Sequence, residues 1–225
     1  QAFKGFWAAT STDDGVTWSD PVKVPAMTPH GPTVLNDGQL MMVSGGKAYR
    51  SGDGGQTWTM TGTVPKNPET WKSRYAFTSE TTCIQADDGR IIALSRYRDG
   101  SDIDLRQTVS TDGGKTWSEP VATGMPGYPA HLLKLNNGWL LASYGRRIEP
   151  MGQRACISKD GGRTWLVDEE IILSLAAPQG GGDLGYPASA QLPDGTIWTV
   201  YYQVEKHEQG EFPSLMATHW RLRGE

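Results

Sequence analysis

The stretch Ser110-Thr-Asp-Gly-Gly-Lys-Thr-Trp117 decides the fold of this chain, because the same eight-residue phrase recurs four times along it. Each copy has serine first, aspartate third, glycine fifth and Thr-Trp at its end, and the copies occupy residues 11–18, 51–58, 110–117 and 158–165. Aspartate and glycine together favour a tight turn between two strands, and a spacing of about 40–60 residues is typical of four-stranded propeller blades. The repeat therefore predicts a β-propeller.

The aspartates of this phrase are expected to be structural rather than catalytic. A carboxylate that accepts hydrogen bonds from its own turn is not free to act on a ligand. Four of the nine tryptophans occupy the last position of the phrase. We expect each of these indoles to fill the wedge between two neighbouring blades.

A second repeat, of inner hairpins, lies between the phrases. Two apolar runs flank an Asp-Gly or Asn-Gly turn, which is the signal of a β-hairpin. The turn glycines are Gly38, Gly89, Gly138 and Gly195. Three of the hairpins are followed by one of the eight-residue phrases, and the fourth continues into a third strand at residues 214–222. The residues around the first phrase supply only half a blade. The 225 residues are therefore predicted to form an all-β chain of about four and a half four-stranded antiparallel blades.

Composition excludes several classes of protein. The net charge of −4 argues against a nucleic-acid binder, which presents a basic face. The sequence has no apolar run of the roughly 18 residues that a membrane-spanning helix needs. Cys83 and Cys156 lie in strand-like runs of different repeats, and we expect them to be buried free thiols rather than a disulfide. Histidines and carboxylates are not clustered at ligand spacing, so neither a metal nor a cofactor is expected.

Strand order predicts where a ligand would bind. In a four-stranded antiparallel blade, the start of strand one, the end of strand two and the start of strand three lie on one face, opposite the hairpin turns. Glu80 and Tyr186 stand equally far before their turn glycines, so both should open an inner strand and face one axial pocket. Arg96 and Arg146 fall at the ends of second strands, and Arg154 falls at the start of a third strand. A carboxylate, a phenol and several guanidinium groups should meet at one mouth.

The eight-residue phrase resembles the Asp box of sialidases and related glycan-active propellers, and we use that name for it below. The segment from Ser79-Glu80 to Arg96 resembles the sialidase segment in which a glutamate precedes the hairpin and a carboxylate-binding arginine follows it. Pro150-Met-Gly-Gln-Arg154 resembles the stretch with a further arginine of the family's triad, and Gly185-Tyr186 resembles the segment with the nucleophilic tyrosine. The segments around His30, Tyr128 and Tyr144 are more similar to a bacterial sialidase-like subgroup.

The resemblance implies a six-bladed propeller in which residues 1–225 form a single domain that lacks one to two N-terminal blades. The family's first triad arginine and its acid/base aspartate belong to the opening blade, so neither is assigned in this chain. Two departures surround the tyrosine: Pro187 follows it where sialidases usually have serine, and Asp183 lies only three residues ahead of it.

The function implied by the resemblance is an exo-acting glycoside hydrolase that cleaves a terminal acidic sugar, sialic acid. Arginines would bind the sugar carboxylate, Tyr186 would attack the anomeric carbon and Glu80 would act as its base. The substrate class implies a secreted or periplasmic protein. The expected substrate-binding residues are Arg96, Arg154, Arg146, His30, His131, Lys47 and Asp183.

Other functions and simpler roles for these residues remain open at this point. A polysaccharide lyase acting on a uronate would use His30, His131 or Tyr186 to take a carbon-bound proton, and a glycan-binding propeller would show no turnover. Glu80 and Arg96 could be an ion pair between adjacent strands, and Tyr186 could be a core aromatic. Arg146 could form a solvated pair with Arg147, and the two histidines could serve packing.

Overall fold

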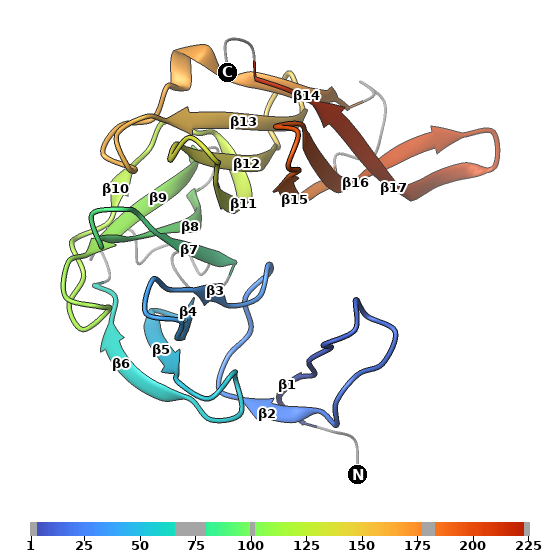
Figure 1. Ribbon diagram of the computed structural model, residues 1–225. Coiled ribbons are helices and arrows are strands. Elements are labelled where there is room, and N and C mark those ends of the chain that lie inside the picture. Colours follow the sequence, from blue (N-terminus) through green and yellow to red (C-terminus); the bar gives the residue numbers. More distant parts are fainter. Residues whose placement is uncertain (1–3, 66–79, 100–101, 177–182, 223–225) are drawn as a thin grey trace.

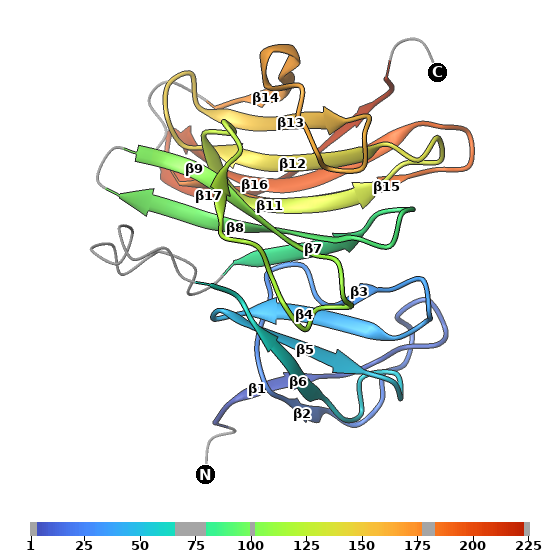
Figure 2. The same cartoon turned by 90° about the vertical axis from the view of Figure 1, so that its left-hand side faces the viewer.

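The computed structural model describes residues 4–65, 80–99, 102–176 and 183–222, which form five antiparallel sheets. Figure 1 shows the sheets side by side around an arc that is open between its first and last members, and Figure 2 shows the same sheets from the side. The predicted all-β propeller architecture is confirmed. Among the described residues, no helix is long and apolar enough to cross a membrane.

Each sheet is ordered from the inside of the arc outward. The first two sheets comprise β1 (Phe6–Ala8) and β2 (Val22–Val24), then β3 (Thr33–Val34), β4 (Leu40–Ser44), β5 (Lys47–Ser51) and β6 (Thr59–Thr63). The third comprises β7 (Thr81–Gln85), β8 (Ile91–Asp99), β9 (Asp102–Ser110) and β10 (Val121–Ala122). The fourth comprises β11 (Gly127–Lys134), β12 (Leu140–Arg146), β13 (Gly152–Ser158) and β14 (Ile171–Leu175), with the 3-10 turn η2 (Val167–Glu169) before β14. The last comprises β15 (Leu184–Gln191), β16 (Ile197–His207) and β17 (Gly210–Trp220).

The two sequence repeats map onto fixed places in every blade. The inner hairpins are β3–β4, β7–β8, β11–β12 and β15–β16, and each Asp box links the third strand of a blade to the fourth. The pair β1–β2 encloses the first box and so corresponds to the outer half of a blade. The inner strands β3, β7, β11 and β15 line the concave side of the arc, where the site residues were predicted to face one another.

The Asp box holds its own turn together through side chains. In the third box, Ser110 Oγ donates to Asp112 Oδ1 (2.9 Å), and the Thr116 amide and hydroxyl donate to Oδ1 (2.9 Å) and Oδ2 (2.6 Å). The other three boxes repeat these contacts. Hydrogen bonds from Thr116 lower the pKa of Asp112 to about 2. The prediction that these carboxylates are occupied within their turns is confirmed.

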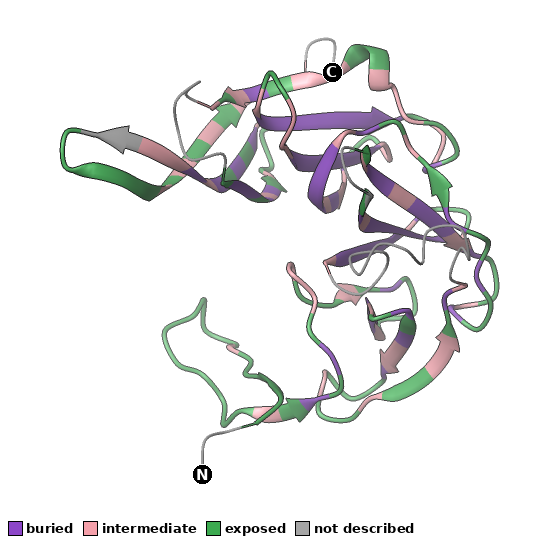
Figure 3. Ribbon diagram, turned by 180° about the vertical axis from the view of Figure 1, so that it is seen from behind, coloured by how far each residue is buried: buried purple, intermediate pink, exposed green. Residues whose placement is uncertain are grey.

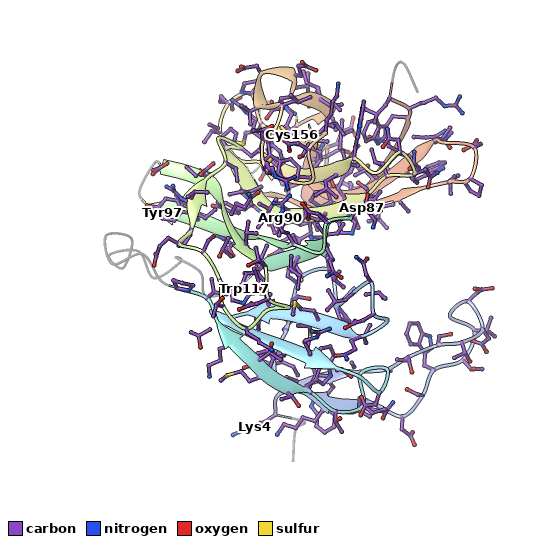
Figure 4. All side chains as sticks on the ribbon, turned by 60° about the vertical axis from the view of Figure 1, so that its left-hand side comes forward. Lys4, Asp87, Arg90, Tyr97, Trp117 and Cys156 are labelled. Atoms are coloured by element: carbon purple, nitrogen blue, oxygen red, sulfur yellow. The ribbon has the colours of Figure 1, made fainter. Side chains whose placement is uncertain are left out.

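Two of the box tryptophans, Trp117 and Trp165, contact the preceding blade. Trp117 is 7% exposed and lies in a core cluster with Met41 of the neighbouring blade, as Figure 4 shows by its place between the two sheets. The Trp165 indole donates to Gln107 of the blade before it (2.7 Å). Trp18 is 64% exposed, so the expectation of an enclosed inter-blade position is not met within the described residues. Among those residues, no other sheet lies against the first box on that side.

The turns and the strand ends with predicted site residues lie at opposite ends of the blades. Figure 4 shows Asp87, in the β7–β8 turn, and Tyr97, near the end of β8, at opposite ends of one sheet. At the turn end, Arg90 donates to the Gly161 carbonyl in the box of the next blade (2.7 Å), and Lys134 pairs with Asp87 (2.9 Å). Polar links between blades thus occupy the turn face, which leaves the other face for a ligand.

The apolar core runs between the sheets and is densest around the fourth blade. Figure 3 shows β12 and β13 buried almost throughout, whereas β1 is exposed. Cys83 and Cys156 are free and buried, as predicted, and burial raises the pKa of each thiol to about 11. Neither thiol is therefore available as a reactive thiolate near neutral pH.

Replacing Gly62 with alanine should lower stability by about 2–3 kcal/mol, because there is no room for a methyl group. A Cβ at Gly62 would overlap the Gly114 carbonyl oxygen and come within 2.5 Å of that of Lys115. These are backbone atoms of the next blade, so moving them to make room would disturb the structure of that blade and cost free energy. Gly52→Ala is the matched control, since its nearest neighbour would be Gln39 Cδ at 3.9 Å. Urea unfolding of both variants measures the difference, and equal stabilities would contradict this account of blade contact.

Candidate active site

Glu80 and Tyr186 come from different sheets and meet directly. Glu80 immediately precedes β7 and Tyr186 lies in β15, with the β11–β14 sheet between their own sheets. The Tyr186 hydroxyl donates to Glu80 Oε1, and Arg96 Nη1 donates to Glu80 Oε2 (2.7 Å). The prediction that strand order alone brings the phenol, the acid and Arg96 together is confirmed. Glu80 and Arg96 also form the ion pair that was the simpler interpretation of these two residues.

The backbone is strained at both residues. Glu80 has φ 60° and Tyr186 has φ 50°, and the only other described non-glycine residue with positive φ is Asp14. A bulky residue such as tyrosine rarely adopts this conformation, which costs about 1–3 kcal/mol. Strain of this kind persists where the surrounding structure enforces it, and it concentrates at functional sites. The conformation marks the pair as more than packing.

Tyr186 is the accessible member of the pair. It is 39% exposed, whereas the Glu80 side chain is 14% exposed. Burial, and then the hydrogen bond to Glu80 and its negative charge, raise the pKa of Tyr186 to about 12. The phenol is therefore protonated near neutral pH, and its hydroxyl donates a hydrogen bond to Glu80. A molecule that enters from solvent reaches the tyrosine oxygen more readily than the carboxylate behind it.

Further contacts extend the pair into a wider group. The Arg96 and Arg147 guanidinium carbons lie 4.0 Å and 5.4 Å from the ring centre of Tyr128. Arg147 Nη1 and the Tyr202 hydroxyl both donate to Asp183 Oδ1 at 2.8 Å. Tyr202 also stacks on Tyr186, with ring centres 6.0 Å apart. We call these seven residues the axial network: Glu80, Arg96, Tyr128, Arg147, Asp183, Tyr186 and Tyr202.

Three members of the axial network were not predicted as site residues: Tyr128, Arg147 and Tyr202. Tyr202 carried a signal, because it follows its turn glycine, Gly195, by the same interval as Arg96 follows Gly89. The hydrogen bonds from Arg147 and Tyr202 outweigh the effect of partial burial and lower the pKa of Asp183. Asp183 is thus an ionised carboxylate at the mouth of the site.

Arg146 and Arg154 turn away from the axial network, contrary to the sequence-based expectation that they join its mouth. Arg154 is 1% exposed and donates to Glu170 Oε2 (3.2 Å), to the Ser174 carbonyl (2.8 Å) and to the Pro150 carbonyl (2.7 Å). Arg146 also pairs with Glu170 (3.3 Å). Glu170, just after η2, attracts both guanidinium groups, and the enclosed Arg154 has no surface for a ligand.

His30 and His131 form a second, separate pair. Their ring centres are 5.0 Å apart in an edge-to-face arrangement, and the Ser189 amide donates to His131 Nδ1 (3.2 Å). Burial lowers the pKa of each to about 4, helped for His30 by the neighbouring His131. Because Nδ1 of His131 accepts a hydrogen bond, its proton is on Nε2. The ring contact and the hydrogen bond described for this pair are with each other and with Ser189, and Lys47 is an exposed residue of β5, so none of the three is a member of the axial network as defined above.

Acid should destabilise the fold through this histidine pair. The folded-state pKa of about 4 lies below the ordinary value of 6.5, so stability is full above pH 6.5 and is lost as the pH falls towards 4. We expect His131 to account for up to about 3 kcal/mol of that loss. Thermal unfolding of the wild type and of His131→Gln at pH 7 and pH 4.5 measures it. Parallel losses in the two proteins would show that His131 does not titrate as described.

Other candidate sites lie apart from the axial network. A groove of about 540 Å³ runs between β1–β2 and β4 and is lined by apolar groups that include Phe6, Trp7 and Met42. In the part of the chain that the structure describes, no group of three or more histidine, cysteine, aspartate or glutamate side chains could hold a metal ion. The axial network itself presents phenols, carboxylates and guanidinium groups.

Three solved structures share this fold. The chain is 25% identical to a protein of unknown function from Dyadobacter fermentans, with a TM-score of 0.82 over 97% of this chain and 64% of the other. It is 17% identical to the α-L-arabinanase of Penicillium chrysogenum, solved with arabinobiose, with a TM-score of 0.65 over 87% of this chain and 64% of the other. For the GH93 α-L-arabinofuranosidase of Fusarium graminearum, the identity is 15% and the TM-score 0.64, over 88% and 66% of the two chains.

The first two of these proteins are longer than this chain, which spans about 64% of the length of each. Their similarity shows the fold of the chain. A family described as BNR repeat-like domains matches residues 1–201, a range that includes all four Asp boxes and both members of the Glu80–Tyr186 pair. The chain therefore belongs to the family of BNR repeat-like domains.

Proposed function

We propose that this protein is a glycoside hydrolase whose reaction centre is the Glu80–Tyr186 pair. The observation that carries the proposal is the contact itself: a partly exposed phenol donates to a carboxylate, and both residues have strained backbones. A nucleophile within hydrogen-bond reach of a base, with a third group orienting the base, is the general arrangement for covalent catalysis. Here Arg96 is the orienting group, since it holds the other oxygen of Glu80.

The proposed reaction proceeds in two displacements. Glu80 Oε1 takes the phenolic proton as the Tyr186 oxygen attacks the anomeric carbon, and the leaving oxygen takes a proton from solvent as the glycosidic bond breaks. Water then attacks the glycosyl-tyrosine and gives up one proton to solvent, while the departing phenolate recovers its proton from Glu80. Two inversions give net retention at the anomeric carbon. Tyr186 suits the attacking role because it is the more exposed of the two groups.

Two further lines support a glycan as the substrate. The Asp boxes and the Glu80 to Arg96 segment resemble those of sialidases, and taken alone this resemblance would imply a terminal sialic acid. The similar solved structures include an arabinanase and an arabinofuranosidase, which favour a glycan-acting enzyme without favouring an acidic sugar. At identities of 17% and 15%, these structures support the proposed class of enzyme but do not identify its substrate.

The histidine pair favours a second candidate, a polysaccharide lyase acting on a uronate. His30 and His131 stay neutral above a pH of about 4, and His30 Nε2 is buried and accepts no hydrogen bond from the described residues. A neutral imidazole of this kind can take a carbon-bound proton. A lyase product is unsaturated and absorbs in the ultraviolet, whereas a hydrolase product is saturated.

The test is a survey of glycoside cleavage with identification of the product. The protein is incubated with fluorogenic glycosides, a sialoside among them, and with arabinan and uronate-containing polysaccharides. The expected result is release of a saturated sugar that first appears in the anomeric configuration of the substrate, observed by proton NMR. An unsaturated product would favour the lyase, and binding without cleavage of any substrate would favour a glycan-binding protein.

A further inference from the structure

The charged groups of the axial network balance one another. Its two guanidinium groups each hold one of its two carboxylates, Arg96 with Glu80 at 2.7 Å and Arg147 with Asp183 at 2.8 Å. Tyr186 is protonated, because its pKa is raised to about 12. The network therefore has no net charge near neutral pH, and both of its cations already have anionic partners from the chain itself.

A ligand carboxylate would have to share each cation with a carboxylate of the chain, because a guanidinium group has further N–H donors beside the Nη1 that holds its partner. Both oxygens of Glu80 are occupied, by Arg96 and by Tyr186, and the Glu80 side chain is only 14% exposed. Arg96 therefore stays paired with Glu80, and its positive charge is already balanced when a ligand arrives. Arg146 and Arg154, the other arginines that the sequence predicted for the site, are both held by Glu170.

The solvent-facing groups of the axial network can form hydrogen bonds with sugar hydroxyls more favourably than with an anion. The Asp183 side chain is 59% exposed, so its carboxylate can accept hydrogen bonds from sugar hydroxyls but repels a second carboxylate. Beside it, the rings of Tyr186 and Tyr202 lie stacked within 25° of parallel. A pair of tyrosine rings offers an apolar surface for the C–H face of a sugar and hydroxyls for its polar edge.

We propose that the sugar bound at Tyr186 is neutral, a pentose or hexose without a carboxylate. This inference rests on the proposed function of the Glu80–Tyr186 pair and names its substrate class. It departs from the acidic sugar that the sequence resemblance implies, because the structure pairs the arginines on which that expectation depended.

The experiment compares sugars that differ only by the carboxylate. Methyl 1-thioglycosides, which resist hydrolysis, are used as hexoside and uronoside in the gluco, galacto and manno series and as pentosides in the xylo and arabino series, and binding is followed by ligand-observed NMR titration. In the series that binds, we expect the hexoside to bind at least about fivefold more tightly, the effect of roughly one unfavourable charge contact in water. Tighter binding of the uronoside, or no binding in any series, would overturn the proposal.

A variant pair tests the charge argument directly. Asp183→Asn leaves Arg147 without its anionic partner, so we expect uronoside affinity to rise about fivefold relative to hexoside affinity. Asp20→Asn makes the same charge change at an exposed position outside the axial network and should leave the ratio unchanged. An unchanged ratio in Asp183→Asn would overturn the proposal. Failure of the proposed function would look different: glycosides would bind, yet the cleavage survey would release no sugar.

Discussion

Replacing Tyr186 with phenylalanine is expected to reduce kcat/KM by at least about a thousandfold on whichever glycoside the protein cleaves. The substitution removes only the hydroxyl that donates to Glu80. The ring that stacks on Tyr202 remains, so sugar binding should change little and the loss should fall on kcat. An interaction that is needed only in the transition state behaves in this way.

Tyr202→Phe is the matched control for this substitution. It removes a hydroxyl from the neighbouring ring, but that hydroxyl donates to Asp183 and not to Glu80. We expect kcat/KM to fall by no more than about tenfold, in keeping with the loss of one supporting hydrogen bond. Thermal unfolding of both variants shows whether the fold is intact. If Tyr186→Phe retained most of the activity in a folded protein, the Tyr186 oxygen could not be the attacking group.

The fold and the central pair could be predicted from the sequence because both depend on local or repeated chemistry. The Asp box is closed by hydrogen bonds within eight residues, so its side chains specify its turn wherever the phrase occurs. The meeting of Glu80 and Tyr186 follows from strand order, since both open the inner strand of a blade. No knowledge of side-chain partners was needed for either prediction.

The arginines could not be placed in the same way, because their positions depend on partners far away in the sequence. Arg146 is the last residue of β12 and pairs with Glu170, whereas Arg147 follows directly and pairs with Asp183. Successive residues of an extended chain point to opposite faces, so a shift of one position exchanges a site residue for a structural one. Trp18 was misplaced for a related reason: the Asp box specifies its turn but not whether a blade lies beside it.

Arg154→Met should destabilise the protein by about 3–5 kcal/mol, the cost of removing one partner from a buried charge pair. Arg154 is 1% exposed, and its guanidinium group satisfies Glu170 and the carbonyls of Ser174 and Pro150 at once. Methionine fills part of the volume but removes the Arg154 donor from the Ser174 and Pro150 carbonyls and one of the two cations that face Glu170, which keeps Arg146, and each unpaired carbonyl adds to the loss.

The matched control for Arg154→Met is Arg163→Met, in the fourth Asp box. The Arg163 side chain is 59% exposed and pairs with Asp88 on the turn face, and an exposed pair of this kind contributes about 0–1 kcal/mol. Urea unfolding should therefore separate the two variants clearly. A stability close to the wild type for Arg154→Met would show that Arg154 is not structural. In that case Arg154 would be available to bind a ligand, and an acidic sugar would again be the expected substrate.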